Sequence, residues 1–172
     1  NKAVVVAAEA AQGEICEAAN DNDPAQVVVS GHRQAVERAA EIAKEHGARR
    51  AVLLPVSAPF HCALMQPAAD AMATALAETA IAAPAVPLVA NVTAEPVTDP
   101  DEIRRLLVTQ VTHRVRWRES VAFMAAQGVT QTVEIGAGKA LSGMVKRIAK
   151  GVTPLSVAAP EDARRVAEAI AG

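Results

Sequence analysis

The spacing of apolar and polar residues along the chain predicts alternating helices and strands. Over residues 33–46, apolar residues recur every three or four positions, charged residues occupy the opposite face, and Gly47 follows as a stop signal. Further helices are predicted at residues 2–12, about 64–80, from Pro100, about 117–127, from the glycine turn to about Lys150, and from Pro160. Short apolar runs predict strands at residues 14–19, 26–30, 50–56, 86–92, 132–135 and 154–157. Strands separated by helices are typical of an α/β protein with a largely parallel sheet.

The first 56 residues follow a different order of elements. Helix, strand, strand, helix and strand come in succession, which predicts a ferredoxin-like unit that lacks its first strand. The turn-rich sequence NDNDP at 20–24 separates the first two strands, and RAVLLPV at 50–56 predicts a short buried strand. We therefore expect a small subdomain over residues 1–56 and a second subdomain over residues 57–172.

Composition and charge exclude several classes of protein. With 172 residues, of which 51% are hydrophobic and 21% charged, the chain has enough apolar material for a globular core. Aromatic residues make up only 2% and the formal net charge is -2, which argues against a nucleic-acid-binding protein. Cys16 and Cys62 are too few for a disulfide framework and indicate a reducing compartment, so we expect a cytoplasmic protein.

The apolar runs and the first residues of the chain were compared with the patterns of membrane-spanning segments and signal peptides. No apolar run approaches the roughly 18 residues of a membrane span, so no membrane partner is expected. The sequence opens on Asn1 without an initiator methionine and without a signal-peptide pattern. We therefore expect a processed or truncated chain.

Motifs for phosphate, metal and nucleophile sites are incomplete. EIGAGKA, at residues 134–140, lies between a predicted strand and a predicted helix, as a phosphate loop does. However, Val133 replaces the first Gly of the Walker pattern, and Leu141 replaces the third Gly of the dinucleotide fingerprint. A tight strand-to-helix turn is predicted there instead. No HExxH or paired CxxC motif predicts a metal site, and no GxSxG motif predicts a serine nucleophile.

His61 is the most informative single residue. It lies in SAPFHCALM, after a predicted buried strand and before a helix, where α/β sheets place their chemistry. The imidazole could act as a general base, or it could be a core or capping histidine. The neighbouring Cys62 is expected to be a small packed hydrophobe. His32, His46 and His113 are interpreted as structural residues.

Two groups of basic residues are open to two interpretations. Each could be a solvated face, or a patch that recognises phosphates or an acidic protein. The groups are Arg114, Arg116 and Arg118, and Lys139, Lys146 and Arg147.

Four segments, in this order, resemble the malonyl-CoA:acyl carrier protein transacylase family of fatty-acid synthesis. They are AAQGEICEAANDNDPAQVVVSGH, LLPVSAPFHCALMQPAADAM, VTQVTHRVRWRESVAFMAAQGV and EIGAGKALSGMVKRI. The resemblance implies an α/β-hydrolase-like large subdomain with an inserted ferredoxin-like small subdomain. Residues 57–172 then correspond to the C-terminal part of the large subdomain, and residues 1–56 to the small one without its first strand.

The resemblance also implies a chemistry. Family members transfer malonyl from coenzyme A to the phosphopantetheine thiol of acyl carrier protein by a ping-pong mechanism, through a serine in a GHSxG motif. His61 matches the partner of that serine, and Gln110 matches the residue whose main-chain carbonyl orients the histidine. Phe60 and Asn22 match substrate-binding positions, and related acyltransferases that use methylmalonyl often carry Ser in place of Phe60. No cofactor is expected, and the coenzyme A thioester is expected as a substrate.

The sequence departs from the family at its start. The GQGSQ segment, the GHSxG serine and the arginine that binds the malonyl carboxylate are all absent, so the chain resembles the C-terminal half of the enzyme. The expected partners are malonyl-CoA, acyl carrier protein and the missing N-terminal portion. Lys139, Lys146 and Arg147 are candidates for docking the acidic carrier protein. Two alternatives remain open: an acyltransferase domain of a polyketide synthase, and a non-catalytic fragment that binds a carrier protein.

Overall fold

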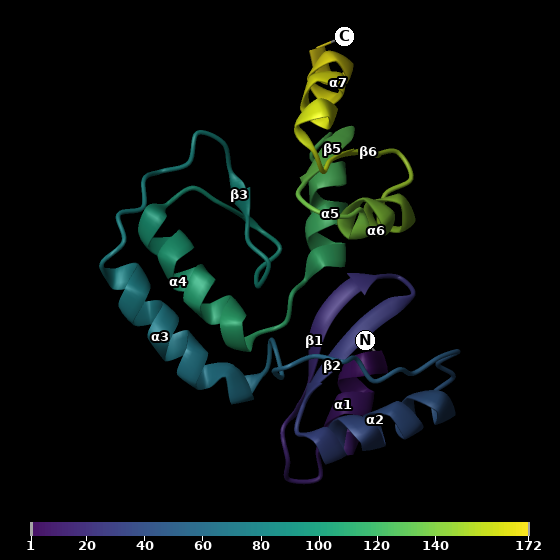
Figure 1. Cartoon of the computed structure of the whole chain (residues 1–172). Coiled ribbons are helices and arrows are strands. Elements are labelled where there is room, and N and C mark those ends of the chain that lie inside the picture. The colour runs from purple at the N-terminus through teal and green to yellow at the C-terminus, as the bar shows by residue number, and fades with distance from the viewer. Residues whose placement is uncertain (1, 172) are drawn as a thin grey trace. The chain divides into compact units, whose positions relative to one another are not determined.

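The computed structural model describes residues 2–171 and has a mixed α/β architecture (Figure 1). Its helices are α1 (Lys2–Ala11), α2 (Arg33–Glu45), the 3₁₀ turn η1 (Ala63–Met65), α3 (Gln66–Ala77), α4 (Pro100–Thr112), α5 (Trp117–Ala126), α6 (Ala140–Ile148) and α7 (Pro160–Ala171). Its strands are β1 (Cys16–Asp23), β2 (Gln26–Gly31), β3 (Leu88–Val89), β4 (Pro96–Val97), β5 (Gln131–Ile135) and β6 (Thr153–Val157). Within residues 2–171, no helix is both long and apolar enough to cross a membrane.

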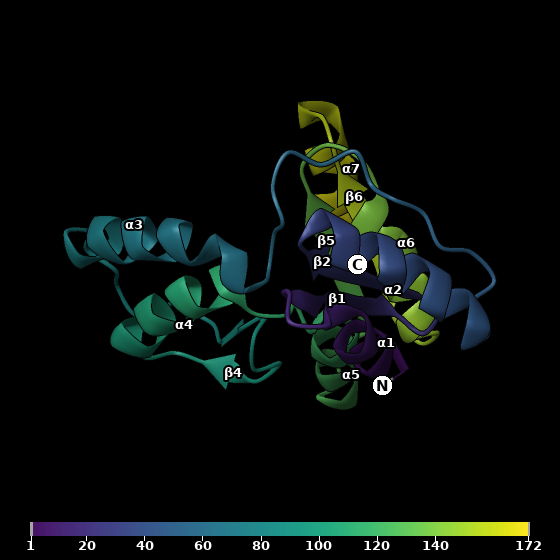
Figure 2. The same cartoon turned by 90° about the horizontal axis from the view of Figure 1, so that it is seen from below.

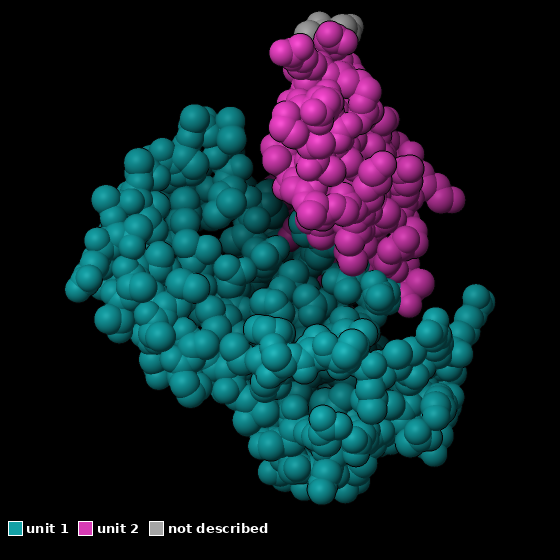
Figure 3. Space-filling view, viewed as in Figure 1, with its two compact units in different colours: residues 1–22, 26–117 teal, residues 23–25, 118–172 magenta. Residues whose placement is uncertain are grey.

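The chain divides into two compact units (Figure 3). Unit 1 comprises residues 1–22 and 26–117, and unit 2 comprises residues 23–25 and 118–172. This division follows packing density. The subdomain boundary expected after residue 56 comes from the order of elements and the family resemblance, and it stays a prediction.

The predicted helices are all confirmed, with ends shifted by a few residues. The predicted turn over residues 20–24 is wrong, because β1 continues to Asp23 and only two residues connect it to β2. Asp23 Oδ1 accepts a hydrogen bond from the Ala25 N–H at 2.8 Å, and its Oδ2 accepts one from Arg147 Nε at 2.8 Å. A polar run that satisfies its carboxylates in this way can remain extended.

The predicted strand over residues 50–56 is also wrong. These residues form no strand, and the side chains of Val52, Leu53, Leu54 and Val56 are 51–60% exposed. The Val56 N–H bonds locally, to the carbonyl of Leu54 at 2.9 Å. An apolar run becomes a strand only when a neighbouring strand accepts its main-chain hydrogen bonds, and the described residues supply none beside this segment.

The strand predicted over residues 86–92 shrinks to β3, which pairs with β4 in an antiparallel sheet. In unit 2, β5 and β6 pair in parallel, from Gln131 opposite Thr153 to Ile135 opposite Val157, and α6 connects them. A parallel pair needs such a crossover, which is why the glycine turn and α6 lie between the two strands.

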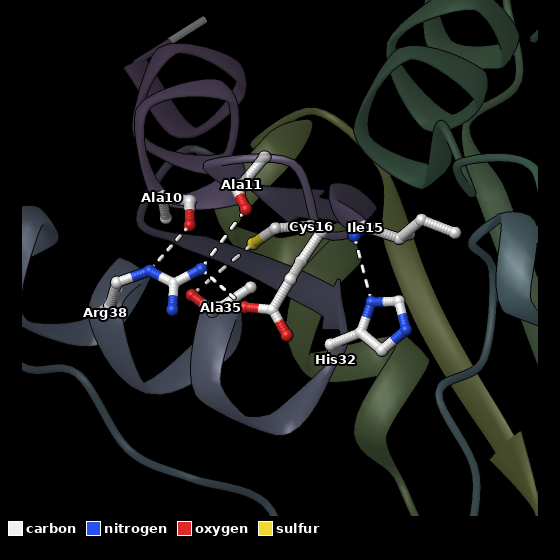
Figure 4. Close-up of polar contacts among 8 residues, drawn as sticks. Ala10, Ala11, Ile15, Cys16, His32, Ala35 and Arg38 are labelled. Atoms are coloured by element: carbon white, nitrogen blue, oxygen red, sulfur yellow. Dashed lines mark hydrogen bonds and ion pairs between the residues drawn. The ribbon is translucent and has the colours of Figure 1, made fainter.

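In unit 1, α1 and α2 pack against each other and share a hydrophobic core. Small side chains make close contact possible, and the core consists of Val6, Ala7, Ala10, Cys16, Ala35 and Ala39. Arg38 on α2 joins these helices (Figure 4): its Nε donates to the carbonyl of Ala10 at 2.9 Å and its Nη2 to that of Ala11 at 3.2 Å. The guanidinium therefore caps the C-terminal end of α1. His32 joins the start of β1, since its Nδ1 accepts from the Ile15 N–H at 2.9 Å.

Helices α3 and α4 lie side by side in unit 1 (Figures 1 and 2). Asp99 caps α4, because its Oδ1 accepts from the Glu102 N–H at 2.8 Å, which confirms the predicted helix start. Arg104 on α4 donates to the carbonyls of Leu76 and Thr79 at the end of α3. These contacts join the start of α4 to the end of α3.

Candidate active site

His61 has a strained main chain. Its φ is +60°, in the left-handed region that costs a residue other than Gly about 1–3 kcal/mol. The next residue, Cys62, is fully buried, and its Sγ–H donates to the carbonyl of Pro59 at 3.1 Å. This buried thiol is packed as expected and anchors the loop at His61. Strain of this kind is concentrated at functional sites, where surrounding contacts maintain it.

The imidazole of His61 contacts the end of α4. Its Nδ1 lies 2.9 Å from the main-chain oxygen of Gln110. A carbonyl oxygen only accepts hydrogen bonds, so Nδ1 carries the proton and a neutral ring presents its lone pair on Nε2. Nε2 is therefore the atom that can accept a proton. This contact is the one that the family resemblance implies for Gln110.

The carbonyl of Gln110 is available because of its position in α4. A helical carbonyl at position i normally accepts from the N–H of residue i+4, which for Gln110 is Arg114, beyond the helix end at Thr112. The carbonyl accepts from the His113 N–H at 3.4 Å and from the ring of His61. The C-terminal end of a helix also carries partial negative charge, which stabilises a positively charged imidazole.

A cavity of about 340 Å³ adjoins this pair. It is lined by Phe60, His61, Met65, Met72, Leu107, Gln110 and Val111. Its size is at the lower end of the range for small-molecule sites, and its walls are apolar apart from the histidine and the glutamine. Phe60 is 49% exposed. The structure thus brings three of the predicted residues together: His61, Gln110 and Phe60.

Asn91 also contacts this site and is not among the residues predicted from the sequence. Its Nδ2 donates to the side-chain Oε1 of Gln110 at 3.1 Å. It follows β3 in the turn towards β4, and no motif in the sequence marks it. Arg116 is close by, and its Nη1 donates to the carbonyl of Thr93 at 2.7 Å, so this member of the arginine group has a structural contact.

The other predicted residues lie elsewhere. Asn22 is on β1, where its Nδ2 lies 3.5 Å from Gln26 Oε1, and it is not among the described residues that line the cavity. Lys139, Lys146 and Arg147 belong to unit 2. Lys139 immediately precedes α6 and Lys146 lies on it, and both are exposed. Arg147 differs from them, because its Nη2 lies 2.7 Å from Oδ2 of Asp23, whose side chain is 1% exposed.

The glycine turn before α6 is a strand-to-helix turn, as expected. Gly136 and Gly138 have φ values of +138° and +90°. Glu134 accepts from the N–H groups of Leu141 and Ser142 at 3.1 and 2.7 Å, so a carboxylate already occupies the helix N-terminus. Hydrogen bonds from the Ser142 hydroxyl and main-chain amide hold the pKa of Glu134 below its ordinary value. This side chain takes the place that a phosphate takes in a phosphate loop.

Known proteins resemble the chain in sequence and in structure. No protein-family model matches it. The malonyl CoA-acyl carrier protein transacylase of Escherichia coli K12 is 49% identical over 152 residues, which are 88% of this chain and 49% of the relative. The chain therefore spans about half the length of the curated relatives that it matches.

Two solved structures extend the likeness over almost the whole chain. The acyl-carrier-protein S-malonyltransferase of Bartonella henselae matches with a TM-score of 0.94 and 47% identity, over 99% of this chain and 55% of that one. A malonyl-transacylase in complex with its type II polyketide synthase acyl-carrier protein matches with a TM-score of 0.93 and 40% identity, over 98% and 55%. By sequence and by structure, this chain is homologous to the malonyl CoA-acyl carrier protein transacylases, and it corresponds to about half the length of a family member.

Proposed function

We propose that this chain forms the part of a malonyl-CoA:acyl carrier protein transacylase that supplies the general base and one wall of the acyl site. In this proposal His61 is the base, and the carbonyl of Gln110 orients it. The nucleophilic serine and the group that binds the malonyl carboxylate lie on a segment outside these 172 residues. Residues 57–172 belong to the α/β-hydrolase-like subdomain, and residues 1–56 to the ferredoxin-like one. The 2.9 Å contact between His61 Nδ1 and Gln110 O carries the proposal.

The proposed reaction has two half-reactions. His61 Nε2 takes the proton of the serine hydroxyl while the serine oxygen attacks the thioester carbonyl, and the proton passes to the coenzyme A sulfur as the C–S bond breaks. In the second half-reaction Nε2 takes the proton of the phosphopantetheine thiol, whose sulfur attacks the malonyl ester. The C–O bond then breaks, and the proton returns to the serine.

A carbonyl is a sufficient orienting group for this chemistry. In serine proteases a carboxylate fixes the histidine tautomer and stabilises the imidazolium. Here the carbonyl of Gln110 fixes the tautomer, and the negative end of α4 stabilises the positive charge. A thioester is more reactive than an amide, so a base without a carboxylate partner is chemically adequate.

Two exposed features support a further polypeptide segment in the working enzyme. The apolar residues Val52, Leu53, Leu54 and Val56 are 51–60% exposed. Among residues 2–171, the parallel sheet consists of β5 and β6 alone, and Ile135 on β5 is 81% exposed. Parallel sheets are normally covered on both faces, and two strands alone are marginally stable. Both features fit a chain that corresponds to about half of its relatives.

A chimera tests the proposed function. We would fuse this chain behind the N-terminal half of the E. coli relative and measure transfer of radiolabelled malonyl from coenzyme A to acyl carrier protein. The chimera is expected to transfer malonyl, and each half alone is expected to be inactive. A soluble, folded chimera without transfer activity would contradict the proposal and favour a fragment that only binds a carrier protein.

The acceptor in the second half-reaction has two candidates. The names of the curated relatives support an acyl carrier protein as acceptor, and the family resemblance favours the one of fatty-acid synthesis. A polyketide synthase carrier protein is favoured by the matched complex of such a protein with its malonyl-transacylase. The ratio of kcat/KM values for the two carrier proteins in the chimera distinguishes them.

Charge reversal on α6 tests carrier-protein docking. Lys146→Glu in the chimera is expected to raise the KM for the acidic carrier protein about two- to tenfold and to leave the KM for malonyl-CoA unchanged, since an exposed lysine contributes through weak charge attraction. Arg147→Glu is the matched comparison. It places a carboxylate next to the buried carboxylate of Asp23, so its expected effect is a lower Tm. Equal changes in both KM values for Lys146→Glu would contradict a docking role.

A further inference from the structure

We infer that Asn91 is a positioning residue for the His61 base. This inference rests on the proposed function and adds a residue to its machinery. Asn91 Nδ2 donates to Gln110 Oε1 at 3.1 Å, and the main-chain oxygen of Gln110 lies 2.9 Å from His61 Nδ1. The three residues therefore form one chain of contacts. Asn91 acts on His61 through the glutamine, whose side chain and carbonyl face two different partners.

Asn91 is itself held firmly. The turn between β3 and β4 closes with hydrogen bonds from the Ala90 N–H to the Glu95 carbonyl at 3.1 Å and from the Ala94 N–H to the Ala90 carbonyl at 2.8 Å. The carbonyl of Asn91 also accepts from the Arg116 N–H at 2.8 Å. Because these contacts use main-chain atoms, they fix the residue and leave its side-chain amide free to reach α4.

Gln110 needs such a tether because it lies in the last turn of α4. Residues at a helix end fray, and the carbonyl of Gln110 has no i+4 partner inside the helix. A solvent-exposed glutamine side chain without a hydrogen-bond partner in the protein would not restrain its own main chain. The hydrogen bond from Asn91 restrains it, and the carbonyl then stays directed at Nδ1 of His61.

The inference predicts a specific property of the His61 ring. With Gln110 restrained, the proton resides on Nδ1 and the lone pair on Nε2. When the restraint is lost, the carbonyl moves and the ring takes up the opposite tautomer more often. A purely structural role of Asn91 in its turn would lower stability without changing the tautomer ratio.

Long-range ¹H–¹⁵N spectra of the ¹⁵N-labelled chain measure this ratio without any assay of activity. In the unaltered chain, the Nδ1–H form of His61 is expected to predominate. Asn91→Leu and Gln110→Ala are each expected to lower the ratio of Nδ1–H to Nε2–H about two- to tenfold, as the loss of one hydrogen bond does. The double variant is expected to match the single variants, because both changes remove the same contact. Thr109→Val, next to Gln110 on α4, should leave the ratio unchanged.

Three results would overturn the inference. They are a predominant Nε2–H form in the unaltered chain, an unchanged ratio in folded Asn91→Leu, and effects of the two single changes that multiply in the double variant. If Asn91→Leu fails to fold, Gln110→Ala decides alone, since it keeps the carbonyl and removes only the tether. An inactive chimera would contradict the proposed function and would leave the tautomer measurement valid.

Discussion

Replacing His61 by alanine in the active chimera is expected to lower kcat/KM for malonyl transfer by roughly 10³- to 10⁶-fold. The reason is that a nucleophile and its base act as a unit, so losing the base removes most of the activation of the serine. His61 is also the only histidine among the described residues that line the cavity at the end of α4. The measurement is the rate of malonyl transfer at saturating and at limiting malonyl-CoA.

His113→Ala is the matched control for this prediction. The Nδ1 of His113 lies 2.9 Å from the carbonyl of Thr109, a contact with the same helix end as that of His61. His113 is exposed and lies outside the cavity at His61, so its removal is expected to change the rate by less than about threefold, as surface substitutions do. Equal losses in the two variants would show that helix-end contacts, and not the base at the cavity, limit the rate.

Replacing Phe60 by serine is expected to increase the preference for methylmalonyl-CoA over malonyl-CoA by about 10- to 200-fold at most. Phe60 and His61 both line the cavity, and in the proposed function a substituent on the malonyl α-carbon would lie beside the Phe60 ring. One methyl group in an apolar pocket changes discrimination by only about 1–3 kcal/mol, which sets this upper limit. The measurement is the ratio of kcat/KM values for the two thioesters in competition.

Met72→Ala is the control for this change of selectivity. Met72 lines the same cavity from α3, so its truncation enlarges the space without removing the ring next to His61. A smaller change in selectivity is expected. If both kcat/KM values of Phe60→Ser fall together and the Tm drops, Phe60 is a packing residue and the selectivity role is wrong. Its exposure of 49% favours the selectivity role, because a half-exposed ring contributes less to the core.

The helices and their limits could be predicted from local pattern. Asp99 and Pro100 start α4, and the glycine turn precedes α6, because capping and turn preferences depend on residues close in sequence. The candidate base could be found from the SAPFH segment, since it matches a family pattern in this order of segments. Local pattern could not identify Gln110 as the partner of His61, because the two residues are 49 positions apart, and only the family resemblance implied this contact.

The two wrong predictions, the turn at residues 20–24 and the strand at residues 50–56, have the same cause: main-chain pairing depends on segments that are distant in the sequence. NDND in residues 20–23 has the composition of a turn, yet it is strand, because its main chain pairs with β2 and, at Asn20 and Asp21, with the distant Val115. RAVLLPV has the composition of a buried strand, yet the described residues offer it no neighbour and leave it exposed. Local preference is overridden in one case by a distant partner and in the other by the absence of one.

The sequence by itself thus determined the helices, the mixed α/β class and the histidine to examine. Each of these depends on periodicity, on capping or on a contiguous motif, which are properties of neighbouring residues. Only the tertiary structure decided that Asn91 holds Gln110 and that Arg147 pairs with Asp23, and it placed the Gln110 carbonyl against His61 as the family resemblance implied. These are contacts between side chains and helix ends that are distant in sequence, and packing alone brings them together.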